Sequence, residues 1–253
     1  MNAAGLLPPA LHLVSAVFLV ALSALLVAVH GALLFAAAGR SELPARARLR
    51  GPALATAFLA LWLGVGITVG DAANFPLPAS ARLPVSLAVG FGTMLLALGC
   101  LRGSATLRAL NAAMPPQWLV RVQTYRVAGL IFLFPFLAYG VIPASFALPA
   151  AVGDTVVGLL APAVASALAA GRPGAQRWAV AWNLFGILDL VVAPSAAILS
   201  HAQIISIYPL TVVALFLGPP LGILTHVLSL RNLAVRSAGA PSRGPSALTP
   251  VVT

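Results

Sequence analysis

Residues 178–200 read WAVAWNLFGILDLVVAPSAAILS, an apolar stretch long enough to cross a bilayer as a helix. Asp189 is the one charged residue in this stretch. It lies about 16 Å from the start at 1.5 Å per residue, near the midplane of a hydrocarbon core about 30 Å thick. An ionisable side chain is costly at that depth, so Asp189 is a candidate functional residue.

The composition indicates that lipid is the solvent of this chain. Hydrophobic residues make up 61% of the 253 residues and charged residues 7%, whereas soluble domains carry about 25% charged residues. The net charge is +10, but the arginines fall between apolar runs and form no basic stripe with interleaved aromatic residues, so nucleic acid is not expected as a partner. The sequence contains no lysine, which excludes a retinal Schiff base. The single Cys100 excludes an internal disulfide and a multi-cysteine metal site.

The apolar runs predict the fold. Seven runs approach or exceed the length of about 18 residues that a spanning helix needs, and they cover residues 11–38, 53–70, 83–101, 122–142, 150–169, 178–200 and 207–230. We therefore expect an all-α, polytopic membrane helix bundle with seven transmembrane helices over residues 1–233. Residues 234–253, rich in small and polar residues, are expected to form a flexible cytoplasmic tail. The longest loop, residues 102–120, is compatible with a short interfacial helix that ends at Pro115 and Pro116.

The arginines predict the orientation of the bundle. They cluster after the first, third, fifth and seventh runs, whereas Arg82 is alone on the opposite side. Because cytoplasmic loops carry the excess of basic residues, the N-terminus is expected outside and the C-terminus in the cytoplasm.

Prolines inside the last four runs suggest a polar site at the level of Asp189. Each proline deprives the carbonyl four residues earlier of its helical donor, and the carbonyls concerned belong to Ile131, Gly158, Leu190, Leu215 and Phe216. A carboxylate with freed carbonyls near the midplane is typical of Na⁺ or H⁺ sites in transporters. The alternative is that the prolines simply kink the helices and nearby hydroxyls compensate.

Asp189 requires a partner, hydration or a proton. It shares a helix face with Trp182 and Gly186, and the small residue suggests a packed rather than a lipid-facing surface. Arg126 is the basic residue that enters a run from its cytoplasmic edge, and a stretched arginine could reach Asp189; otherwise it extends back to the headgroups. Asn183 lies at a similar depth to Arg126, and Gln123 precedes Arg126 by three residues, so both are candidate members of the site.

Asp154 opens the fifth run, where it either caps the helix against the dipole or lines a vestibule that attracts cations. On this assignment its depth differs from that of Asp189 by about 12 Å. That separation argues against an intramembrane aspartyl protease, whose two carboxyls must share a proton.

No cofactor is expected, although the histidines allow a test for haem. His30 and His226 lie towards the inner side, and His12 and His201 lie at the outer edge. A haem ligated by His30 and His226 is a minor alternative.

From Gln123 onward the chain resembles a family of uncharacterised, multi-pass bacterial inner-membrane proteins. The resemblance covers residues 121–233 and depends on Gln123-x-x-Arg126, Pro143, Asp154, Trp182-Asn183, His226 and Arg231-x-Leu233. It implies a location in the bacterial cytoplasmic membrane and draws attention to Arg126, Asp154 and Asn183. It implies no substrate.

Two functions remain as hypotheses. The first is a transporter-like protein that binds a cation, proton or small solute between the fourth and seventh helices, with Asp189 as carrier and Arg126, Asn183, Asp154 and Gln123 around it. The second is a non-catalytic scaffold or assembly subunit that binds another membrane protein. Neither the H-E-x-x-H nor the G-x-S-x-G motif occurs, so an enzyme is not favoured.

Overall fold

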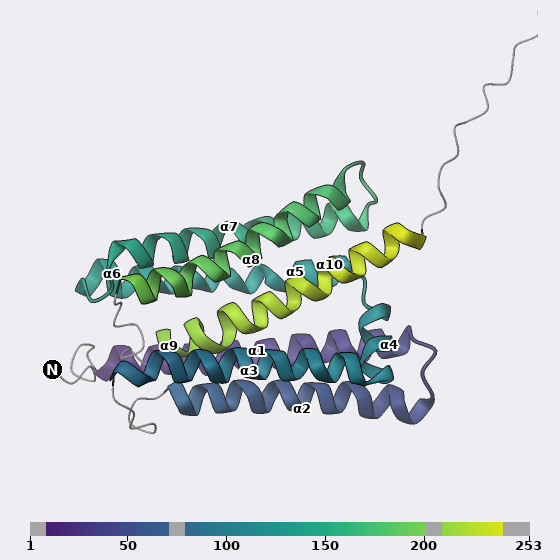
Figure 1. Cartoon of the computed structure of the whole chain (residues 1–253), viewed down its shortest axis with the longest axis horizontal. Coiled ribbons are helices and arrows are strands. Elements are labelled where there is room, and N and C mark those ends of the chain that lie inside the picture. The colour runs from purple at the N-terminus through teal and green to yellow at the C-terminus, as the bar shows by residue number, and fades with distance from the viewer. Residues whose placement is uncertain (1–8, 71–78, 201–208, 240–253) are drawn as a thin grey trace, which may run out of the picture.

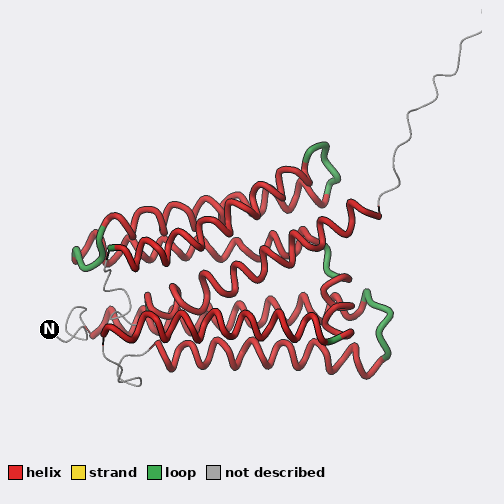
Figure 2. Tube along the Cα trace, viewed as in Figure 1, coloured by secondary structure: helices red, strands yellow, loops and turns green. Residues whose placement is uncertain are grey.

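The computed structural model describes residues 9–70, 79–200 and 209–239. These residues are almost entirely helical and contain no strand (Figure 2). Seven helices are long and apolar enough to cross a membrane, over Ser15–Gly39, Ala45–Thr68, Pro84–Gly103, Pro116–Tyr139, Ala144–Ala169, Ala175–Leu199 and Leu210–Ser237. The predictions of an all-α fold and of seven spanning helices are therefore confirmed for the described part of the chain.

The first three long helices form one group: α1 (Pro9–Gly39), α2 (Ala45–Gly70) and α3 (Ala79–Gly103) (Figure 1). A short helix, α4 (Ala105–Ala113), lies across one end of this group. The Ser104 hydroxyl caps α4 by accepting a hydrogen bond from the Leu107 N–H at 3.2 Å. The helix ends at Ala113, and its C-cap Met114 directly precedes the two prolines that were expected to break it.

A second group contains the fourth, fifth and sixth spans (Figure 1). The fourth span is made of three pieces: α5 (Pro116–Val122), a 3₁₀ helix η2 (Gln123–Phe132) and α6 (Leu133–Tyr139). The next two spans are the antiparallel helices α7 (Ala144–Ala169) and α8 (Ala175–Leu199). The turn between α7 and α8 contains Gly171 and Gly174 with φ of 60° and 75°, a backbone conformation that favours glycine.

The last span runs between the two groups (Figure 1). It begins with α9 (Leu210–Val212), continues as a π-helix η4 (Val213–Leu221) that contains Pro219 and Pro220, and ends as α10 (Gly222–Gly239). Most of its residues are buried, unlike those of the other six spans. Helix α10 continues past residue 233, so the predicted boundary between bundle and tail falls inside a helix. Residues 240–253 lie outside the described residues.

The fifth span starts earlier than the sequence suggests. Its predicted start at residue 150 is wrong, because α7 begins at Ala144, directly after Pro143. Pro149 leaves the carbonyl of Ser145 without its helical donor. Ser145 is exposed near the helix end, so this loss is tolerated there. The shift of six residues changes the depth of every side chain on this helix.

Candidate functional site

The 3₁₀ helix η2 carries the central residue of the site. Such a helix has three residues per turn, so side chains three apart lie in one row. Gln123, Arg126, Gly129 and Phe132 are three apart, and they are the buried residues of η2. Helix η2 makes extensive contact with α7, and side chains of this row also bond to α8 and α10. A run of ten residues is long for this type of helix, because its hydrogen bonds are less favourable than those of an α-helix.

Two aspartates share the guanidinium of Arg126. Its Nε donates to Asp154 Oδ1 at 2.7 Å, and its Nη2 donates to Asp189 Oδ2. The Arg126 side chain is 1% exposed, whereas those of Asp154 and Asp189 are 14% and 10% exposed. Arg126 therefore reaches inward to Asp189 and does not extend back to the headgroups. Its other carboxylate partner is Asp154, which the sequence analysis placed at a different depth from Asp189.

Asp154 and Asp189 lie at the same level of the bundle. Helices α7 and α8 are antiparallel; Asp154 follows Ala144 by ten residues, and Asp189 precedes Leu199 by ten residues. Each carboxylate is therefore about 15 Å from the same end of the hairpin. The predictions that Asp154 opens its helix and differs in depth from Asp189 are wrong, because both depended on the helix start at residue 150.

His226 on α10 contacts the Nη1 atom of the guanidinium, which neither aspartate contacts. Its Nε2 lies 3.2 Å from Arg126 Nη1, and its Nδ1 lies 2.9 Å from Asn183 Oδ1. Arginine has no acceptor, so Nε2 must accept and the imidazole proton must lie on Nδ1, where it is donated to Asn183. Asn183 in turn donates to the Ala179 carbonyl at 2.7 Å and to Ser229 Oγ at 3.2 Å. His226 is therefore neutral and is held in one tautomer.

Three glycines provide the space for this cluster, which we call the Arg126 cluster: Arg126, Asp154, Asp189, His226 and Asn183. A Cβ on Gly129 would overlap Asp154, and one on Gly153 would overlap Asp189. A Cβ on Gly186 would overlap the imidazole of His226, and the Gly186 carbonyl accepts from Arg126 Nη1 at 3.2 Å. The cluster thus depends on close backbone approach at three helices.

A small cavity adjoins the two carboxylates. It has a volume of about 30 Å³, and its walls include Asp154, Asp189, Leu190, Pro194 and Leu215. The rest of its wall is apolar, so the two carboxyls are its polar side chains, and its volume has room for one water molecule. Of the five residues whose carbonyls the prolines were expected to free, two line this cavity. Leu190 and Leu215 line the cavity, but the carbonyl that contacts Arg126 belongs to Gly186.

Gln123 is buried beside the cluster but has other partners. Its Nε2 donates to the Gly222 carbonyl at 3.1 Å, and its Oε1 has no partner among the described residues. The Tyr125 hydroxyl donates to the Leu217 carbonyl at 2.9 Å. These two bonds join η2 to the last span where the π-helix passes into α10.

His30 and His226, the two histidines whose side chains the structure describes, have separate sets of neighbours. His30 lies on α1, where its Nδ1 donates to the Leu26 carbonyl at 2.8 Å. An iron bound by His226 would have to displace Arg126 or Asn183. Residue 201 and the side chain of His12 lie outside what the structure describes. Within the described ranges, no group of three or more His, Cys, Asp or Glu residues is placed to hold a metal ion.

Sequence reasoning missed the three-residue period of η2 and two of the three glycines. The period is visible in the spacing of Gln123, Arg126, Gly129 and Phe132. An α-helix, the form expected for a membrane span, has 3.6 residues per turn, so a three-residue spacing does not stand out as one face of it.

A family model described as "Domain of unknown function (DUF8737)" matches residues 83–234. This range runs from α3 into α10 and contains every member of the Arg126 cluster. No curated protein and no solved structure matches the chain.

Proposed function

This chain belongs to the family described as Domain of unknown function (DUF8737), and we propose that it is a transporter-like membrane protein that binds one exchangeable proton at Asp154 and Asp189. The observation that supports this most directly is the sharing of one buried arginine by two carboxylates.

The charges of the cluster do not balance without an added positive charge. Arginine stays protonated in proteins, and His226 is neutral because it accepts from Arg126. With both carboxylates ionised, the cluster would carry one net negative charge. Among the described residues, no second cation pairs with either aspartate. Because an uncompensated buried charge is strongly unfavourable, the two carboxyls are expected to hold one proton between them.

The small cavity lies on one side of the Arg126 cluster. The small cavity reaches both aspartates, whose side chains are partly exposed. On the opposite side, His226, Asn183 and Ser229 are fully buried. A proton site near the middle of the bundle that is open towards one side is the arrangement that alternating access requires.

The helices around the cluster contain two elements suited to a conformational change. Arg126 lies on the 3₁₀ helix η2, and the π-helix η4 lines the cavity. Conversion of η2 to an α-helix would change the rotation per residue from about 120° to about 100°. Arg126 would then turn by about 60° relative to Gln123, enough to withdraw it from one of its carboxylates.

The membrane placement is part of the proposal. The arginine bias supports a bacterial cytoplasmic membrane protein with its N-terminus outside and its C-terminus in the cytoplasm. In that orientation the ends of α7 and α8 at Ala144 and Leu199 face outward, and the cavity, which Phe146 and Ala197 also line, extends towards the outer side.

Infrared spectroscopy provides a direct test, because the whole chain has only four Asp and Glu side chains. We expect the carbonyl band of one protonated carboxyl at neutral pH. Asp154→Asn or Asp189→Asn should each abolish it, because either change leaves one carboxylate for Arg126. Glu42→Gln removes an exposed carboxylate in the loop before α2 and should leave the band unchanged. A wild-type spectrum without the band would reject the bound proton.

Transport requires a separate measurement. Proteoliposomes that contain a trapped pH indicator should acidify or alkalinise faster with the wild type than with Asp189→Asn, and Glu42→Gln should behave as the wild type. Equal rates in all three would exclude Asp189 as a proton carrier. If the infrared band is absent and Na⁺ or K⁺ raises the thermal stability of the wild type but not of Asp189→Asn, the site holds a cation instead.

The scaffold hypothesis is favoured by a different observation. Arg126 engages Asp154, Asp189, His226 and the Gly186 carbonyl together and so ties η2, α7, α8 and α10 to one another. If the protein is a scaffold, it should copurify from native membranes with a stoichiometric protein partner, and it should carry no proton flux in proteoliposomes.

A further inference from the structure

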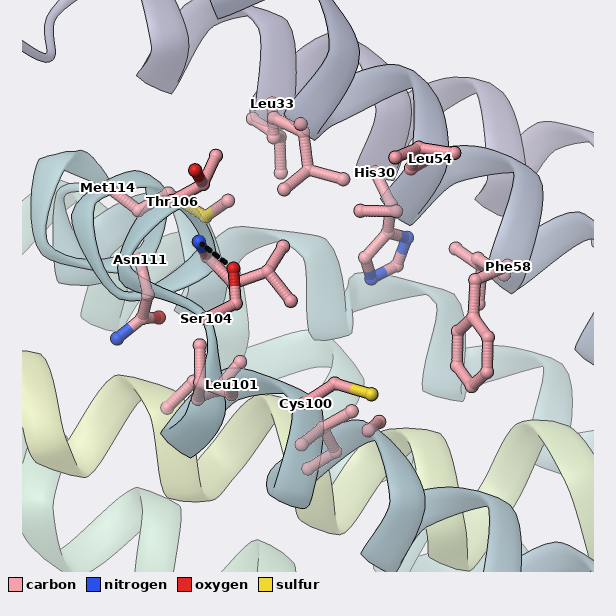
Figure 3. A pocket seen from close by; sticks show the side chains of 18 of the residues that line it. His30, Leu33, Leu54, Phe58, Cys100, Leu101, Ser104, Thr106, Asn111 and Met114 are labelled. Carbon is pink, nitrogen blue, oxygen red and sulfur yellow. Dashed lines mark hydrogen bonds between the residues drawn. The ribbon is translucent and has the colours of Figure 1, made fainter. Parts of the chain in front are cut away.

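A large apolar cleft, separate from the small cavity beside Asp154 and Asp189, opens between α1, α2, α3, α4 and α10. Figure 3 shows side chains that line it. Its volume is about 670 Å³, within the range of about 300–1,000 Å³ that is typical of small-molecule sites. Most of its wall is aliphatic or aromatic; Leu54, Phe58 and Leu101 are examples. We propose that this cleft binds one anionic phospholipid, with an acyl chain inside and the headgroup at Arg46 and Arg50.

The mouth of the cleft carries only positive charge. Arg46 and Arg50 are four residues apart on α2, so they lie on the same face of that helix. Both are exposed, and no aspartate or glutamate is among the residues that line the cleft. Neither arginine forms an ion pair with a described residue. Two unpaired cations at the edge of an apolar cleft complement an anionic headgroup above a hydrocarbon chain.

The length of the cleft fits one leaflet. Arg50 and Trp62 both line it and are twelve residues apart on α2, which corresponds to about 18 Å. Half of a hydrocarbon core is about 15 Å thick. The cleft therefore extends from headgroup level towards the bilayer midplane. It is accessible from the side, because Leu54 on α2 and Cys100 on α3 line it and are exposed.

Three residues that line the cleft carry polar atoms that have no partner among the described residues. Trp62 and Asn111 are each 4% exposed, yet Trp62 Nε1 and Asn111 Oδ1 have no partner among the described residues. The His30 ring is directed into the cleft (Figure 3). Its Nδ1 is occupied by Leu26, and its Nε2 has no partner among the described residues. Buried polar groups are normally paired, so these three atoms are exceptions in the wall of the cleft, and they lie beneath its accessible surface.

This inference depends on the proposed membrane location but not on the proton site. Native mass spectrometry of the full-length protein in detergent, with added phosphatidylglycerol or phosphatidylcholine, provides the test. Each basic residue near a membrane surface contributes about a fivefold preference for anionic lipid, so two should give about 30-fold tighter binding of phosphatidylglycerol. We expect one tightly held lipid per chain and loss of the preference in the double variant Arg46→Gln with Arg50→Gln.

Two controls separate the cleft from general charge attraction. The double variant Arg172→Gln with Arg177→Gln removes the same charge from exposed positions in the α7–α8 turn and at the start of α8, and it should keep the preference for phosphatidylglycerol. Ala97→Phe places a bulky side chain in the cleft and should weaken the binding of both phospholipids. Cys100, the only cysteine, reports occupancy directly, because bound lipid should slow its reaction with a maleimide.

Equal binding of the two phospholipids, an unchanged preference in the Arg46 and Arg50 variant, or tighter binding of oleate than of phosphatidylglycerol would each overturn the proposal. The Asp189→Asn variant should bind phosphatidylglycerol as the wild type does. Failure of the proton assays would therefore leave the lipid result intact, and the reverse is also true.

Discussion

Replacement of Arg126 by methionine should remove the one positive charge of the Arg126 cluster and leave two carboxyls without a cation. The side chain is 1% exposed and is shared by Asp154 and Asp189. Loss of one partner from a buried ion pair typically lowers the free energy of unfolding by about 3–5 kcal/mol. Methionine has a similar length and no charge, so the loss arises mainly from the two aspartates that remain.

The dependence on pH distinguishes this explanation from simple misfolding. Each proton that the folded cluster binds beyond the unfolded chain changes the free energy of unfolding by about 1.4 kcal/mol per pH unit. The proposed shared carboxyl proton is one such proton, so the stability of the wild type should fall as pH rises, by up to about 1.4 kcal/mol per unit. In Arg126→Met both carboxyls must be protonated for the cluster to be neutral. The free energy of unfolding of this variant should therefore fall twice as steeply with pH, by about 2.7 kcal/mol per unit. Asp189→Asn needs none, and its stability should not depend on pH through this cluster.

Unfolding by sodium dodecyl sulfate, followed by tryptophan fluorescence in detergent at several values between about pH 5 and pH 8, measures these slopes. The fully neutral variant, Arg126→Met with Asp154→Asn and Asp189→Asn, should recover most of the lost stability and show no slope, because replacing all members of a buried ion cluster is often neutral. The charge argument is refuted if Arg126→Met has the wild-type slope, or if the neutral variant is as unstable as Arg126→Met.

Three further substitutions test the packing around the cluster and the ends of the bundle. Gly153→Ala should push Asp189 away from Arg126 and lower the free energy of unfolding by about 1–3 kcal/mol, whereas Gly64→Ala, which has open space around its Cα, should be neutral or slightly stabilising in the same thermal-unfolding assay. His226→Phe should leave Arg126 and Asn183 each short of one bond and cost about 1–3 kcal/mol; full stability in detergent unfolding would mean that water replaces the imidazole. Asn232→Ala should loosen α4 from α10 by a similar amount, because its Nδ2 donates to the Asn111 carbonyl at 2.7 Å and the Met114 carbonyl at 3.0 Å. Faster hydrogen exchange confined to α4 would report this loosening, and exchange that is unchanged there would contradict it.

The sequence was sufficient for the helix count because hydrophobic length is a local property. Each of the seven spans has enough apolar residues to be recognised without its neighbours. Arg126, Asp189 and Asn183 were singled out for the same reason, since polar residues are conspicuous inside apolar runs.

The geometry of the cluster could not be read from sequence, because it depends on backbone features with weak local signals. Pro149 obscured the true start of α7, and this error displaced Asp154 by six residues. The 3₁₀ conformation of η2 is less favourable than an α-helix for most sequences. In this protein it occurs where Arg126 pairs with Asp154 of α7. The apolar cleft was also missed, because empty space between helices is not encoded by the pattern of any one of them.

The order in which the charges appear along the chain has a consequence for biosynthesis. Arg126 emerges from the ribosome before Asp154 and Asp189, which follow it by 28 and 63 residues. A lone arginine at the centre of an inserting helix costs about 2.5–3.5 kcal/mol on the insertion scale. The fourth span should therefore wait at the translocation channel until the fifth arrives, and the two should enter the lipid as a hairpin with their opposite charges already joined.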